Sequence, residues 1–94
     1  MKLNDLVRHI DHTGASDAEI TAITYDSRKA GPGALFVCLV GAWMDGHTFA
    51  QSAYDQGCRA FLVERLLDLP ADAAQIVTDD TRAALAVIGA DFYD

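Results

Sequence analysis

An uninterrupted apolar run of seven residues, at positions 34–40, constrains the fold of this chain more than any other feature of its sequence. The run carries no charge, and turn-forming residues bound it, with Gly31, Pro32 and Gly33 before it and Gly41 after it. A buried run this short favours a strand, because a buried helix needs about ten or more residues. We therefore expect a central strand that other elements cover on both faces.

Three further segments favour strands. Residues 20–25 are rich in β-branched and aromatic side chains, which fit a pleated surface well. Residues 60–63 form a second short apolar run, and residues 75–78 form a shorter one. Together with the central run, these segments predict four strands.

Three segments favour helices. The first has Asn4 as its expected N-cap, and its apolar residues recur with helical spacing at Leu3, Leu6, Val7 and Ile10. The second contains Phe49, Ala50, Ala53 and Tyr54 on one face and is expected to end at Gly57, a residue type common just after a helix. The third would be capped by Asp79 or Asp80, and its apolar stripe is Leu85, Ile88 and Phe92.

The expected order is helix, strand, strand, helix, strand, strand, helix. Strands alternating with helices predict an α/β fold, here a small three-layer α/β/α domain with a mostly parallel sheet and right-handed crossovers. At 94 residues and 51% hydrophobic content, we expect one domain over residues 1–94 without an internal repeat or linker. The sequence stops at Asp94 directly after an expected helix, which indicates a cut through a longer protein.

The net charge of the chain limits the classes of molecule that it can bind. Fourteen acidic and seven basic residues give a net charge of −7, which repels a polyphosphate backbone, so we expect no binding to nucleic acid. A phosphorylated small ligand would have to be held by backbone N–H groups and a few placed cations. No apolar run approaches the roughly 20 residues that span a bilayer, and no export signal is visible, so we expect a soluble chain without membrane contact.

Cysteine and histidine offer little for metal or redox chemistry. Cys38 and Cys58 are too few for a disulfide framework or a zinc cluster, and their apolar neighbours indicate reduced core residues. His9 and His12 stand three residues apart without an evident third ligand, which favours surface histidines. We therefore expect no metal site.

The most informative polar residues follow the first two expected strands. Ligands of open α/β sheets bind beyond the carboxyl ends of the strands. Ser27 follows the first strand, beside the only adjacent cationic pair, Arg28 and Lys29, and the loop at 41–46 follows the second. Ser27 offers a hydroxyl to a phosphate or a base edge, and Trp43 offers a flat ring on which a base could stack.

Structural interpretations of these residues stay open beside the functional ones. A Ser-Arg-Lys triplet also suits an ordinary turn with solvated charges, and a lone tryptophan such as Trp43 commonly packs half-buried. His47 suits either a helix cap or a ligand contact, and the pair Asp79 and Asp80 suits helix capping better than acid–base or metal chemistry. Spacing alone predicts one crevice and no reaction.

Longer blocks of sequence resemble a known family. The blocks are Ile-Thr-Tyr-Asp-Ser-Arg-Lys at 23–29, Gly-Pro-Gly-Ala-Leu-Phe-Val at 31–37, Leu-Val-Gly at 39–41, Asp-Gly-His at 45–47 and Val-Glu at 63–64. From about Ile20 to Tyr93 the chain resembles the amino-terminal domain of the Mur ligases. Tyr25 before Asp-Ser-Arg, and the block at 80–85, resemble the branch that adds the third residue of the peptidoglycan stem peptide. The branch that adds D-alanyl-D-alanine shares the Asp-Ser-Arg block.

The resemblance implies a cytoplasmic, ATP-dependent ligase acting on UDP-MurNAc-L-Ala-D-Glu. In this family ATP phosphorylates the terminal carboxylate of the substrate, and the amine of an amino acid attacks the acyl phosphate to form an amide. ATP and Mg²⁺ belong to a central domain that opens with a loop of the Gly-Thr-Asn-Gly-Lys-Thr kind, which this chain lacks. The resemblance therefore implies a substrate-recognition domain without catalytic residues or a cofactor of its own, which works with the central and carboxyl-terminal domains.

The resemblance also places the UDP contacts. By position, Tyr25 and Ser27 contribute from the first loop, and Ala42, Trp43 and Met44 from the second. The second set departs from the more polar residues of some relatives, so backbone groups and apolar contact are expected there. The competing expectation is a non-catalytic regulatory module similar to the amino-terminal domain of HPr kinase, which would show no preference for uridine.

Overall fold

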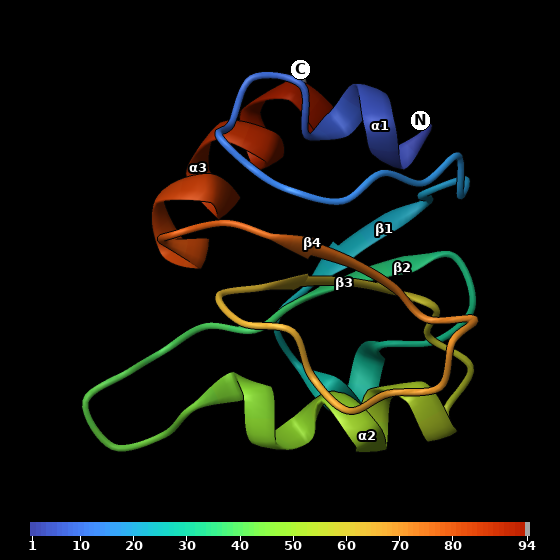
Figure 1. Ribbon diagram of the computed structural model, residues 1–94, viewed down its shortest axis with the longest axis vertical. Helices are drawn as coiled ribbons and strands as arrows, with labels where there is room; N and C mark the ends of the chain where they lie inside the picture. The colour runs from blue at the N-terminus through green and yellow to red at the C-terminus, as the bar shows by residue number, and fades with distance from the viewer. Residues whose placement is uncertain (94) are drawn as a thin grey trace.

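The computed structural model describes residues 1–93, which form a four-stranded, fully parallel sheet with the order β1-β2-β3-β4 (Figure 1). The strands are β1 (Ala22–Thr24), β2 (Ala34–Val37), β3 (Ala60–Val63) and β4 (Ala74–Val77). Every residue of the central strands β2 and β3 is buried. The prediction of a parallel α/β sheet with a central strand at this apolar run is confirmed.

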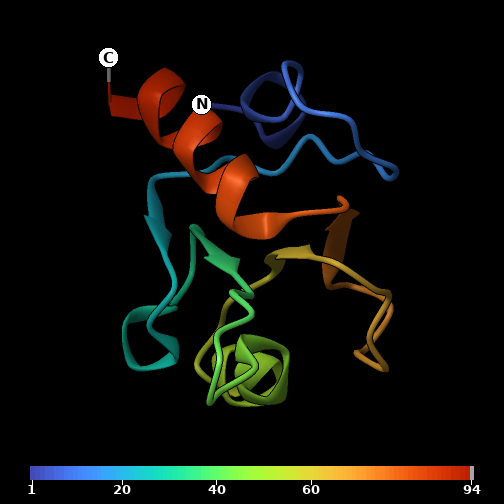
Figure 2. The same cartoon turned by 90° about the vertical axis from the view of Figure 1, so that its left-hand side faces the viewer.

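Helices cover both faces of the sheet (Figures 1 and 2). They are α1 (Leu3–Leu6), α2 (Ala50–Asp55) and α3 (Thr81–Tyr93), with two 3₁₀ turns, η1 (Ser27–Lys29) and η2 (Gly46–Phe49). Helices α1 and α3 contribute to the core on one face and α2 to the core on the other. The three-layer prediction is therefore confirmed.

The two cores follow from the alternation of side chains along a strand. Leu35 and Val37 of β2 point toward α1 and α3, while Phe36 points toward α2. There its ring meets that of Phe61 edge to face, with ring centres 6.2 Å apart. A continuous apolar run thus supplies both faces of the sheet.

Two predicted helix caps are confirmed and one was wrong. Two helices are also shorter than predicted, because α1 ends at Leu6 and α2 begins after Phe49. Gly57 lies just past α2 with a φ of +105°, and the carboxylate of Asp80 accepts from the Ala83 N–H at 3.0 Å, as expected of caps. Asn4 as an N-cap was wrong, because Lys2 holds that position. The Asn4 side chain instead accepts from the Ser16 N–H and holds the following segment against α1.

Both cysteines are buried and free, which confirms them as core residues. Burial raises the pKa of the Cys38 thiol to about 12 and also raises that of Cys58. His9 is more than half exposed and pairs with Asp91. Within residues 1–93 no three His, Cys, Asp or Glu side chains gather as a metal site would require. Nor does any helix in this range combine the length and apolarity needed to cross a bilayer.

A buried histidine fixes the segment that follows β2. The side chain of His47 is fully buried, and its Nε2 accepts from the Glu64 N–H at 2.9 Å. Nδ1 therefore carries the proton and donates to Oδ1 of Asp45 at 2.6 Å. His47 therefore has a structural role, but it is not the helix cap that the sequence suggested, because Asp45 is the N-cap of η2.

The same connection reaches α3 through Glu64. Its carboxylate accepts from the Thr81 N–H at 2.9 Å, and the Thr81 hydroxyl donates to the Cys38 carbonyl at 2.7 Å. Thr81 is fully buried. The ends of β2 and β3 and the start of α3 are thereby joined by hydrogen bonds.

We expect His47→Ala to lower the free energy of unfolding by about 1–3 kcal/mol, because the Glu64 N–H loses its acceptor and Asp45 loses a donor. Denaturant unfolding of the 94-residue chain measures the change. The matched control is His9→Ala, whose exposed side chain should change stability by less than about 0.5 kcal/mol. Equal losses in both variants would contradict the anchoring role of His47.

The stability provided by Asp45 should depend on pH. The His47 backbone N–H, with smaller contributions from the His47 ring and Arg65, lowers the pKa of Asp45 from 3.8 to about 2. A lowered pKa means that the ionised carboxylate stabilises the fold above pH 3.8 and that this stabilisation is lost as the pH falls toward 2.

The measurement is urea unfolding of the wild-type chain and of Asp45→Asn at several pH values. The difference in stability between them should be largest near neutral pH and shrink between pH 3.8 and 2. The subtraction removes the parallel contribution of Asp26, whose pKa is also lowered to about 2. A difference that does not vary with pH would contradict the prediction.

Candidate functional site

Two loops leave the sheet side by side at the carboxyl ends of β1 and β2. The first loop (residues 25–33) contains η1, and the second loop (residues 38–45) leads into η2. Parallel pairing sets Thr24 opposite Phe36, so both strands end at the same edge. Helix α2 packs against both 3₁₀ turns and thereby brings the two loops together.

A cavity of about 560 Å³, hereafter the larger cavity, opens between these loops. Its lining residues are Tyr25, Asp26, Ser27 and Arg28 from the first loop, Met44 from the second, Phe49 from η2 and Ser52 from α2. Two-thirds of Tyr25 and nearly two-thirds of Met44 are exposed. Three of the five residues expected at the site, Tyr25, Ser27 and Met44, are therefore brought together.

A smaller cavity of about 190 Å³ shares Tyr25, Met44 and Phe49 with the larger one. It extends along the second loop to the start of α3, and its other lining residues are Leu39, Gly41, Gly46 and Arg82. The shared side chains make the two cavities adjoining parts of one crevice.

The charges beside Ser27 are paired with each other. The Asp26 carboxylate accepts from the backbone N–H of Arg28 at 2.9 Å and from its guanidinium at 2.8 and 3.0 Å. These bonds lower the pKa of Asp26 to about 2 and raise that of Arg28. The Ser27 hydroxyl has no hydrogen-bond partner among residues 1–93, so it remains available to a ligand.

The second loop is a small hairpin that projects from the body of the molecule (Figure 1). The Gly41 N–H donates to the Met44 carbonyl at 2.8 Å, and the Gly46 N–H donates to the Leu39 carbonyl at 2.7 Å. A Cβ on Gly46 would lie 2.8 Å from the Leu39 nitrogen, so this close approach requires glycine.

Ala42 and Trp43 lie at the tip of this hairpin and are exposed. Trp43 is 99% exposed, so the interpretation of a half-buried packing tryptophan was wrong. The two residues sit next to Met44, which lines the larger cavity. Their contact with a ligand stays a prediction.

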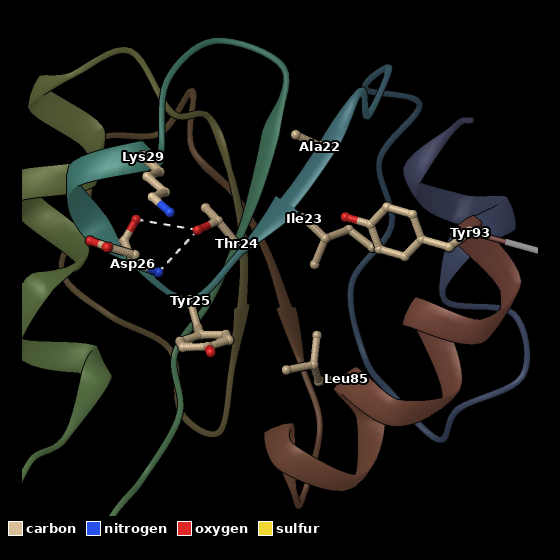
Figure 3. Close-up of a pocket in the computed structure, with 8 residues that line it drawn as sticks. All are labelled: Ala22, Ile23, Thr24, Tyr25, Asp26, Lys29, Leu85 and Tyr93. Carbon is tan, nitrogen blue, oxygen red and sulfur yellow. Dashed lines mark hydrogen bonds between the residues drawn. The ribbon is translucent and has the colours of Figure 1, made fainter.

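A third cavity of about 520 Å³, the edge groove, lies between the edge strand β1 and α3 (Figure 3). Figure 3 shows Tyr93 and Leu85 of α3 facing Ile23 of β1, with the Tyr25 ring at the end of β1. Its lining residues include none from the second loop. Tyr25 therefore stands between the edge groove and the crevice.

Three lining residues of the crevice were not expected from the sequence. Phe49 fits an apolar helical face, yet it lies in η2 and is about one-third exposed toward the larger cavity. Ser52 and Arg82 belong to helices whose sequence shows nothing unusual there. The position of Arg82 just after the fourth strand was the one available signal, because that strand also ends at the ligand-binding edge of the sheet.

Known proteins share sequence and fold with this chain. A family model described as "Mur ligase family, catalytic domain" matches residues 19–93. The UDP-N-acetylmuramoyl-L-alanyl-D-glutamate–2,6-diaminopimelate ligase of Syntrophomonas wolfei is 44% identical over 99% of this chain. The corresponding L-lysine ligase of Staphylococcus aureus strain MW2 is 40% identical over 86% of it. The chain spans 20% and 16% of the length of these two relatives.

Solved structures are also similar. MurF from Acinetobacter baumannii superposes with a TM-score of 0.77 at 36% identity, covering 94% of this chain and 19% of that one. MurF from Thermotoga maritima in complex with ADP, with a TM-score of 0.64 at 23% identity over 79% of this chain and 16% of its own, shows the shared fold alone. Because the family model covers most of the sequence and close relatives align along nearly all of it, the chain belongs to the Mur ligase family.

Proposed function

We propose that this chain is the amino-terminal, uridine-nucleotide-binding domain of a longer ligase. In this proposal the ligase adds the third amino acid to UDP-MurNAc-L-Ala-D-Glu during peptidoglycan synthesis in the cytoplasm. The observation that carries the proposal is the larger cavity, where Tyr25 and Ser27 of one loop meet Met44 of the other. The names of the relatives from Syntrophomonas wolfei and Staphylococcus aureus support the choice of substrate.

The lining of the larger cavity suits a nucleoside. Tyr25, Met44 and Phe49 provide apolar surface against which a flat pyrimidine ring can lie. The Ser27 hydroxyl, free of protein partners among residues 1–93, can hydrogen-bond to the base or to a phosphate. In this proposal Ala42 and Trp43, at the exposed tip of the hairpin, close over the bound ring.

Binding at this distance from the reaction still contributes to catalysis. The uridine diphosphate end is remote from the carboxylate that reacts, and holding it restricts the position of that carboxylate. Binding energy from such a remote group can offset the cost of orientation at the reacting centre. The role of this domain is therefore to position the substrate.

ATP and Mg²⁺ do not fit the residues described here. The sequence contains no glycine-rich loop followed by Lys-Thr or Lys-Ser. Residues 1–93 also hold no cluster of three metal-ligating side chains. We assign the nucleotide-triphosphate and metal chemistry to the central domain of the longer protein, which with the carboxyl-terminal domain is the proposed partner of this one.

A ligase that adds D-alanyl-D-alanine is the second candidate, supported by the similarity to MurF from Acinetobacter baumannii at 36% identity. Relatives named for the third residue match at 44% and 40%, which favours the first candidate. These two relatives are named for different amino acids, diaminopimelate and lysine.

We expect Ser27→Ala to weaken the binding of UDP by about 1–2 kcal/mol, because the ligand loses one hydrogen bond. Calorimetric titration measures the affinity, with the full muropeptide precursor as a second, tighter ligand. Ser16→Ala, which removes a hydroxyl outside the crevice, is the control and should bind as the wild type does. Unchanged affinity in Ser27→Ala would remove Ser27 from the site.

We expect the fluorescence of Trp43 to change when UDP binds. Trp43 is the one tryptophan of the chain and is 99% exposed, so a ring stacked on it, or closure of the loop, would shift its emission. ADP at the same concentration is the matched ligand control and should have little effect. A response to UDP that ADP reproduces would contradict uridine recognition and favour the regulatory-module alternative.

A further inference from the structure

The smaller cavity contains a cation with no assigned role. Arg82 lines this cavity from the second residue of α3, together with Tyr25 and Met44 of the two loops. Tyr25, Met44 and Phe49 also line the larger cavity, so a ligand seated there can extend directly toward Arg82.

Four backbone donors near the smaller cavity are already in use. The N–H groups of Gly41 and Gly46 are bonded within the second loop. At the start of α3, the Thr81 N–H is bonded to Glu64 and the Ala83 N–H to Asp80. An anion entering this cavity therefore cannot use these four N–H groups, whereas the Arg82 guanidinium has no hydrogen-bond partner among residues 1–93 and lines the cavity.

Among the side chains that line the crevice, Arg82 is the unpaired cation. Arg28 also lines the larger cavity, but its guanidinium donates two hydrogen bonds to the Asp26 carboxylate, which neutralises its charge locally. Arg82 forms no ion pair with any of residues 1–93. Because the whole chain carries a net charge of −7, a negatively charged ligand needs such a local cation.

We propose that Arg82 binds a phosphate group of the nucleotide whose base and ribose occupy the larger cavity. A guanidinium suits this role because its planar N–H groups donate two parallel hydrogen bonds to phosphate oxygens. The proposal rests on the proposed function and adds the orientation of the bound nucleotide. The nucleoside lies between η1 and α2, and the diphosphate points along the second loop toward the start of α3.

The test compares uridine, UMP and UDP as ligands of the wild-type chain and of Arg82→Gln, by calorimetric titration in low salt. The wild type should bind UDP more tightly than uridine. In Arg82→Gln the affinity for UDP should fall about tenfold, while the affinity for uridine should stay within about twofold, because only the phosphates lose a partner. Arg82→Lys should fall between the two, since it keeps the charge without the planar geometry.

Arg8→Gln is the matched control, because it changes the net charge equally at an exposed position in the segment after α1. It should leave the preference for UDP unchanged, and thermal unfolding should show all variants folded. Equal losses of uridine and UDP affinity in Arg82→Gln, or an unchanged preference for UDP, would overturn the Arg82 assignment and leave the uridine site standing. If the wild type bound neither uridine nor UDP, the proposed function would fail, and the Arg82 assignment with it.

Discussion

Burial of β2 and β3 on both faces is the constraint from which the rest of the structure follows. A strand without a polar face can only lie between two layers of helix, and its parallel partners then all end at the same edge. Two short loops consequently face each other, and a cavity forms without any long insertion. The crevice is thus a consequence of burying both faces of the central strands.

The sheet was accessible to sequence reasoning because apolar runs of this length admit few interpretations. The predictions of element ends were wrong where contacts with residues distant in the sequence overrode the local pattern. The apolar run extends to Val40, but the strand ends at Val37, because Leu39 already bonds to Gly46 in the base of the hairpin. Asn4 has the chemistry of a cap, yet its side chain is used to hold Ser16. Neither partner is identifiable from the local sequence.

The candidate site, like the fold, could be predicted in part from the sequence. The rule that ligands bind beyond the carboxyl ends of strands pointed to Ser27 and to the second loop, whereas Tyr25 and Met44 were named only by the family resemblance. Phe49 depends on how η2 docks, which its helical spacing does not encode, and for Arg82 the one signal was its position after β4. His47 suited either a helix cap or a ligand contact, and the two hydrogen bonds of its buried ring show that it serves the fold.

The tip and the base of the second-loop hairpin are under different constraints. The bulkiest side chain of the domain, Trp43, contributes almost no contact area to the folded state, while the small residue Gly46 beneath it tolerates no added atom. Residues at the tip can therefore change with the chemistry of the ligand at little cost to folding. The base of the same hairpin, in contrast, is held to one residue by the backbone alone.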